Sequence, residues 1–112
     1  MTDFSYLNVD NAYKLINQKV TKTPLVTNDY INNLLEAEIY FKLENLQNTG
    51  SFKLRGATHK ITKLIENVKD SGVVAYSSGN HAQAVAYASM INSISAKIIM
   101  PKTAPQIKIE NT

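Results

Sequence analysis

Lys53 lies between two apolar residues, Phe52 and Leu54, directly after an expected turn. Residues 42–57 read KLENLQNTGSFKLRGA and contain the only arginine of the chain. Lys53 is expected in the first turn of a helix, where free backbone N–H groups and a partial positive charge disfavour a protonated amine. A neutral lysine amine is a nucleophile that can form an imine. An ordinary solvated lysine is the competing interpretation, and the residues alone leave both open.

A second polar group follows a short apolar stretch. Its residues are Ser77, Ser78, Gly79, Asn80 and His81. They lie between an expected strand and an expected helix, where open α/β sheets place their ligands and where backbone N–H groups bind anions. The sequence therefore predicts a carboxylate or phosphate at this loop. The alternative is that Ser78 or Asn80 merely caps the helix.

Other kinds of catalytic or metal site find little support. The chain has no cysteine, and its two histidines, His59 and His81, are far apart and lack ligand spacing, so we expect no metal site. The glycines match neither a P-loop nor a dinucleotide fingerprint. His81 has no acid or nucleophile placed beside it that would indicate a general base. Phe52 is typical of a core residue, and Arg55 of a structural ion-pair partner.

The composition is that of a folded protein. Of the 112 residues, 44% are hydrophobic and 19% are charged, and the net charge is +3, which is unlike a disordered chain. The basic residues are spread along the sequence, so we expect no nucleic-acid partner. No apolar run is long enough for a membrane span and the first residues do not resemble a secretion signal, so we expect a cytoplasmic protein.

In the first half of the chain, helices and one strand are the elements expected to position Lys53. Periodicity predicts a helix capped by Asp10 whose apolar face reaches Val20, and a short helix over 28–35. Alternation predicts a strand over 38–44 with one buried face. A helix over 52–69, capped by Ser51, would then carry Lys53.

The second half of the chain predicts a parallel βαβ unit. Residues 73–76 are nearly all apolar, as in strands buried on both faces of a sheet. A helix over 82–91 and a strand over 96–100 follow, and another helix begins near residue 105. The expected fold class is therefore α/β with an open parallel sheet.

Four ordered motifs resemble a known family. The segments KLENLQNTGSFKLRGA and SSGNHAQAVAYAS, with Thr23-Pro24-Leu25 before them and MPKTAP at 100–105 after them, closely resemble the threonine dehydratase and serine racemase family. These are fold-type II enzymes, similar to the β subunit of tryptophan synthase, and they use pyridoxal phosphate. The resemblance covers about residues 10–112.

The resemblance implies a role for each site residue. Lys53 would form the Schiff base with pyridoxal phosphate and later take the Cα proton, Phe52 would pack on the pyridine ring, and Asn80 would bond the ring hydroxyl. The substrate carboxylate would be held by the loop of Ser77, Ser78, Gly79, Asn80 and His81. The implied reaction is a dehydratase reaction that converts L-threonine or L-serine into a 2-oxo acid and ammonia.

Ser78 brings in an alternative activity. Threonine dehydratases resemble SAGNH at this loop, whereas serine racemases resemble SSGNH, with the second serine as acid/base opposite the lysine. Racemisation needs a proton donor on each face of the carbanion, so a serine racemase is the alternative to the favoured dehydratase. A non-catalytic fragment that acts as a binding module is the other alternative.

The resemblance also implies that the chain is the N-terminal portion of such an enzyme. We expect residues 1–112 to form one N-terminal fragment, with 1–56 as the segment bearing the lysine motif and 57–112 as part of the smaller α/β domain. The family's glycine-rich phosphate loop has no counterpart here, so we expect weak cofactor binding and little turnover by the chain alone. Expected partners are the amino-acid substrate and either a missing C-terminal half or a second copy.

Overall fold

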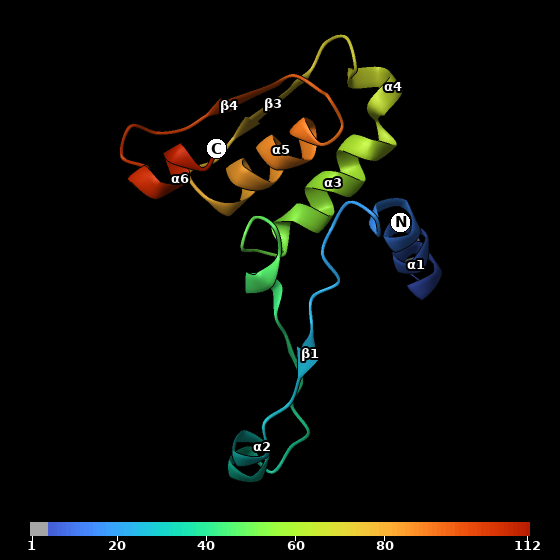
Figure 1. Cartoon of the computed structure of the whole chain (residues 1–112), viewed down its shortest axis with the longest axis vertical. Helices are drawn as coiled ribbons and strands as arrows, with labels where there is room; N and C mark the ends of the chain where they lie inside the picture. Colours follow the sequence, from blue (N-terminus) through green and yellow to red (C-terminus); the bar gives the residue numbers. More distant parts are fainter. Residues whose placement is uncertain (1–4) are drawn as a thin grey trace.

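The computed structural model describes residues 5–112 as a body from which a narrow arm projects (Figure 1). The body contains α1 (Tyr6–Ile16), α3 (Lys53–Lys63), α4 (Ile65–Val68), β3 (Val73–Tyr76), α5 (Asn80–Met90), β4 (Ala96–Ile99) and α6 (Gln106–Glu110). The arm contains β1 (Leu25–Val26), α2 (Asp29–Leu35) and β2 (Phe41–Lys42), and a 3-10 turn, η1 (Glu44–Leu46), follows it.

The predicted parallel βαβ unit is confirmed. β3 and β4 pair in parallel, from Val73 opposite Ala96 to Tyr76 opposite Ile99, and α5 connects them and lies along the sheet (Figure 1). The prediction that β3 is buried on both faces is wrong, because Val74 is 70% exposed. Helices pack against only one face of this two-stranded sheet, so alternate side chains of the strand point away from the core.

The core lies where α3 packs against α5 and α1 packs against α3. Ala84 and Ala88 are fully buried on α5, and such small side chains let two helices approach closely. The core cluster comprises Ile16, Val20, Leu54, Ala57, Ile61, Ala84, Val85, Ala88 and Ile94. α3 therefore buries Ala57 and Ile61 of its predicted apolar face, whereas Leu15 on the predicted apolar face of α1 is 42% exposed.

Several predicted helix ends are wrong. α1 begins after Ser5, and Asp10 lies inside the helix, where it pairs with Lys14 at 2.7 Å. The helix expected over 52–69 is interrupted at Leu64, whose φ of −101° and ψ of 10° separate α3 from α4. Ser51 does not cap α3, because its buried hydroxyl has no hydrogen-bond partner among the described residues.

The strand expected over 38–44 is much shorter and more exposed than predicted. Only Phe41 and Lys42 form β2, which pairs antiparallel with β1, and both residues are exposed. α2 matches its prediction closely, with the Asn28 side chain accepting a hydrogen bond from the Ile31 N–H at 3.0 Å. The arm stands clear of the body (Figure 1), so no other element covers the apolar face of β2.

Candidate functional site

Lys53 is the first residue of α3, as predicted. The next residue, Leu54, is fully buried and anchors the start of the helix in the core. Lys53 is exposed, and its Nζ atom lies 5.1 Å from the centroid of the Phe52 ring. Within residues 5–112 its ammonium group forms no ion pair. The Lys53 side chain is therefore exposed beside an aromatic face and unpaired within residues 5–112.

An ion-pair network ties the start of α3 to the preceding loops. Arg55 donates from Nε to Oε2 of Glu44 at 2.9 Å and from Nη2 to Oε1 at 2.7 Å. Arg55 Nη2 also donates to the Thr21 carbonyl at 3.1 Å, and the Thr23 hydroxyl donates to Glu44. The structure thus makes Arg55 an ion-pair partner, as its sequence context suggested. Two parallel hydrogen bonds between a guanidinium and a carboxylate fix the relative orientation of the two side chains as well as their separation.

The same network shifts two pKa values. The side-chain hydrogen bond from Arg55, with a further bond from Thr23, lowers the pKa of Glu44 to about 2 despite the opposing effect of burial. The hydrogen bond to Glu44 raises the pKa of Arg55. Both groups therefore stay charged across the physiological range.

The loop between β3 and α5 opens onto a helix start that no side chain caps. Gly79 is the N-cap residue of α5, and neither Ser78 nor Asn80 supplies a capping hydrogen bond. The Gly79 N–H donates to Ser77 Oγ at 3.3 Å. A Cβ atom added at Gly79 would meet nothing within 4 Å, so no other segment packs against the Cα atom of this residue. Such a helix start suits an anion.

One cavity brings part of the predicted site together. It has a volume of about 520 Å³ and lies between α3, β3 and the start of α5. Phe52, Lys53 and His81 line it, together with apolar residues of β3 and α3. Ser77, Ser78 and Asn80 are outside its lining and adjoin it only through the chain at His81.

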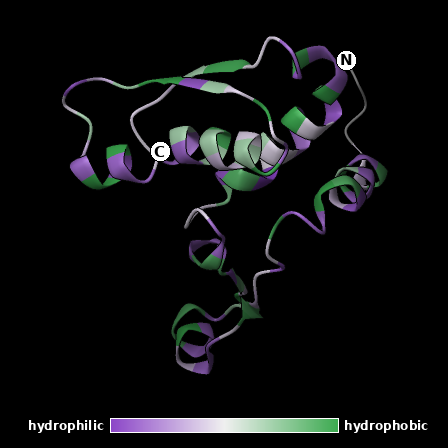
Figure 2. Cartoon of the chain, turned by 45° about the horizontal axis from the view of Figure 1, so that its top comes forward, coloured by the Kyte–Doolittle hydropathy of each residue, from purple (hydrophilic) through white to green (hydrophobic). Residues whose placement is uncertain are grey.

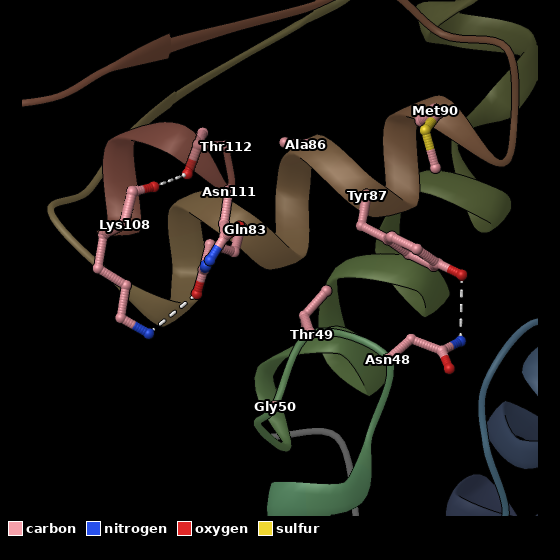
Figure 3. Close-up of a pocket in the computed structure, with 10 residues that line it drawn as sticks. All are labelled: Asn48, Thr49, Gly50, Gln83, Ala86, Tyr87, Met90, Lys108, Asn111 and Thr112. Carbon is pink, nitrogen blue, oxygen red and sulfur yellow. Dashed lines mark hydrogen bonds between the residues drawn. The ribbon is translucent and has the colours of Figure 1, made fainter. Parts of the chain in front are cut away.

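A second cavity contains a contact that the sequence analysis missed. It has a volume of about 610 Å³ and lies between the turn at 48–50, α5 and α6 (Figure 3). On its wall Lys108 of α6 reaches Asn80 and Gln83 of α5. No spacing rule could have revealed this lysine, because 28 residues separate it from Asn80.

The donor set fits pyridoxal phosphate as far as these residues extend. A free lysine amine beside an aromatic ring, an uncapped helix start and an asparagine amide offer an imine-forming group and donors for oxygen anions. Among the described residues no cluster of histidine, aspartate and glutamate could hold a metal ion. No helix within 5–112 is both long and apolar enough to cross a bilayer.

Known proteins resemble this chain closely. The serine racemase of Dictyostelium discoideum is 44% identical over 109 residues, which are 97% of this chain and 34% of that protein. A biosynthetic L-threonine dehydratase of Lactococcus lactis is 52% identical over 101 residues, 90% of this chain and 24% of that protein. The chain thus spans about a third or less of the length of these relatives.

Solved structures agree with the fold. The crystal structure of the Dictyostelium serine racemase matches with a TM-score of 0.89 over 96% of this chain and 35% of that chain. The crystal structure of a T.th. threonine deaminase matches with a TM-score of 0.83 at 41% identity, over 96% of this chain and 33% of that one. The α/β arrangement is therefore the N-terminal part of a fold-type II enzyme. Because the family described as pyridoxal-phosphate dependent enzyme matches residues 16–112, the chain belongs to that family.

Proposed function

We propose that this chain supplies the lysine and the carboxylate-binding loop of an amino-acid dehydratase that acts on L-threonine or L-serine. The observation that carries the proposal is the cavity that Lys53 shares with His81, since it joins the amine at the start of α3 to the first turn of α5. The 52% identity to an L-threonine dehydratase supports the choice of reaction.

Pyridoxal phosphate, when bound, withdraws electrons from the Cα atom of an amino acid and so makes its proton acidic. Lys53 would hold the cofactor through its Nζ atom, and once the substrate's amino group has displaced it, the freed Nζ atom would take the Cα proton. Phe52, whose ring already lies 5.1 Å from that amine, supplies a flat apolar surface for an aromatic ring. The Asn80 amide would donate to the ring hydroxyl.

The loop at 77–81 binds and orients the substrate carboxylate. Backbone N–H groups at the uncapped start of α5 donate to its oxygens, and the partial positive charge of the helix terminus adds to the attraction. A carboxylate held there leaves the rest of the amino acid to face Lys53, so one proton is presented to the base. The substrate's β-hydroxyl group would then take up a proton and leave as water, and the released enamine would react with water to give a 2-oxo acid and ammonia.

Serine racemase is the second candidate, and Ser78 is the observation that favours it. Its hydroxyl lies in the same loop and provides no cap to α5, so it is available as the proton donor on the face opposite Lys53. The Dictyostelium serine racemase, at 44% identity, supports this alternative. In any preparation of the chain that turns over L-serine, Ser78→Ala separates the two activities: loss of L-to-D serine conversion with retained ammonia release indicates racemisation through Ser78, and unchanged racemisation contradicts it.

The test of the main proposal is covalent attachment. The chain is incubated with pyridoxal phosphate, reduced with borohydride, digested and analysed by mass spectrometry. We expect the adduct on Lys53 and its loss in Lys53→Ala. Lys60→Ala is the matched control, because Lys60 lines the same cavity and should leave the adduct unchanged. Adducts spread evenly over the lysines would contradict the proposal.

Turnover is measured separately, as ammonia released from L-threonine and L-serine. We expect little turnover by the chain alone, since it spans only a third of its relatives' length. Specific attachment without turnover would favour the lysine-bearing part of an enzyme. Rapid turnover by the isolated chain would overturn the expectation that it depends on further polypeptide.

A further inference from the structure

Lys108 makes an unusual contact with the start of α5. Its Nζ atom donates to Oδ1 of Asn80 at 2.7 Å and to Oε1 of Gln83 at 3.0 Å, and Figure 3 shows it reaching toward Gln83 beside the cavity. Lys108 is half-buried. Within residues 5–112 no carboxylate pairs with it, so these two amide oxygens are the acceptors that the structure gives its ammonium group.

This location is a poor one for a cation on electrostatic grounds alone. Asn80 is the first residue of α5, and the start of a helix carries a partial positive charge that repels an ammonium group. Lys14 and Lys69 pair with carboxylates, whereas Lys19 donates to the amide oxygen of Asn92 far from any helix start. The contact therefore calls for a reason other than helix stabilisation.

The chemistry of the two amides supplies that reason. An ammonium group donates and never accepts, so it selects the oxygen of each amide and rejects the NH₂ end. The Asn80 amide is planar, and with its oxygen held toward α6 its NH₂ group must point to the other side. Gln83 is only 6% exposed, so the second contact is with a side chain that packing holds still.

We propose that Lys108 is a positioning residue that sets the orientation of the Asn80 amide. It holds the amide oxygen toward α6 and so leaves the Asn80 NH₂ group to donate to a ligand oxygen at the start of α5. The inference rests on the proposed function, in which that oxygen is the ring hydroxyl of pyridoxal phosphate. The positive charge of Lys108 also adds to the field that attracts a carboxylate to the same helix start.

The orientation is tested first without cofactor. NMR couplings of the Asn80 side chain are measured in the wild-type chain, in Lys108→Met, which keeps the apolar stem, and in Lys102→Met, a matched control at an exposed lysine of the preceding loop. We expect one Asn80 rotamer in wild type and control and averaged rotamers in Lys108→Met. Circular dichroism confirms that each variant is folded. An unchanged single rotamer in a folded Lys108→Met would overturn the proposal.

Cofactor binding provides the second readout. We expect Lys108→Met to bind pyridoxal phosphate roughly tenfold more weakly, the effect of one misplaced hydrogen bond, and Lys108→Arg, which also only donates, to recover part of the affinity. Equal affinity in wild type and Lys108→Met would overturn the positioning role. If the wild type forms no adduct at Lys53, the proposed function and the ligand named here both fail, and the rotamer measurement still decides whether Lys108 orients Asn80.

Discussion

Three consecutive side chains at the start of α3 have different environments. Lys53 is exposed beside Phe52, Leu54 is fully buried, and Arg55 pairs with Glu44. Successive residues of a helix point about 100° apart, so fixing the second and third side chains also fixes the direction in which the first one leaves the helix. The Lys53 side chain is thus oriented by neighbours that are themselves held by the core and by an ion pair.

The Glu44–Arg55 pair predicts an acid-dependent loss of stability. The folded-state pKa of Glu44 is about 2, against an ordinary value of 4.5. Because the pKa is lowered on folding, the pair's contribution is complete above pH 4.5 and is lost as the pH falls toward 2. The shift corresponds to at most roughly 3 kcal/mol, which screening by solvent reduces. We expect urea denaturation to show the free energy of unfolding falling across this range.

Glu44→Gln is the variant that isolates this effect. It removes the titrating group, so its free energy of unfolding should be lower than that of the wild type at pH 6 and should fall less between pH 4.5 and 2. Glu66→Gln is the matched control, because Glu66 pairs with Lys69 at an exposed site and such pairs contribute little. An identical acid dependence in Glu44→Gln and the wild type would contradict the prediction.

At the level of elements, the sequence predicted the features that residues close together in the chain determine. The β3–α5–β4 unit and the position of Lys53 at a helix start followed from periodicity and from the polar loop at 77–81. The contacts of Lys108 with Asn80 and of Arg55 with the Thr21 carbonyl did not, because they join residues 28 and 34 positions apart. The exposure of β3 was also missed, since an apolar strand does not reveal how many layers cover it.

Two glycines with left-handed backbones offer a matched test of the turn before β3. Gly72 has a φ of 73°, and a Cβ atom there would lie 2.6 Å from the Ser95 carbonyl oxygen. Gly50 has a φ of 67° with nothing within 4 Å of such an atom. Both changes to alanine introduce backbone strain, but only Gly72→Ala adds a clash that pushes β3 away from the residue before β4.

We therefore expect Gly72→Ala to lower the free energy of unfolding by about 2–4 kcal/mol and Gly50→Ala by about 1 kcal/mol. Urea denaturation followed by circular dichroism measures both. Equal losses in the two variants would show that the approach to Ser95 relaxes at no cost. In that case the positive φ angle alone would account for the preference for glycine at both positions.

For the whole molecule, the outward face of the sheet is the feature that remains unexplained within one chain. Val74 and Tyr76 are 70% and 72% exposed, and Ile99, opposite Tyr76, is 48% exposed. Figure 2 shows hydrophobic residues along both strands. Parallel sheets are normally covered on both faces, and this chain spans about a third of its serine racemase relative. The outward face of this sheet is therefore an apolar surface that the described residues leave uncovered.

Because this face is apolar and exposed, we expect two copies of the chain to associate through their sheets, and an added charge on the face to prevent it. Ile99→Lys adds a second lysine beside Lys97, which already lies on the outward face opposite Val74. Sedimentation velocity over a range of concentrations should show association of the wild type and a larger monomer fraction in Ile99→Lys, because burying a charge in an apolar contact is costly. Leu34→Lys is the matched control on the arm, where Leu34 is 66% exposed. If the arm variant becomes monomeric and the sheet variant does not, then the arm is the surface that needs a partner, and the open sheet face is tolerated in water.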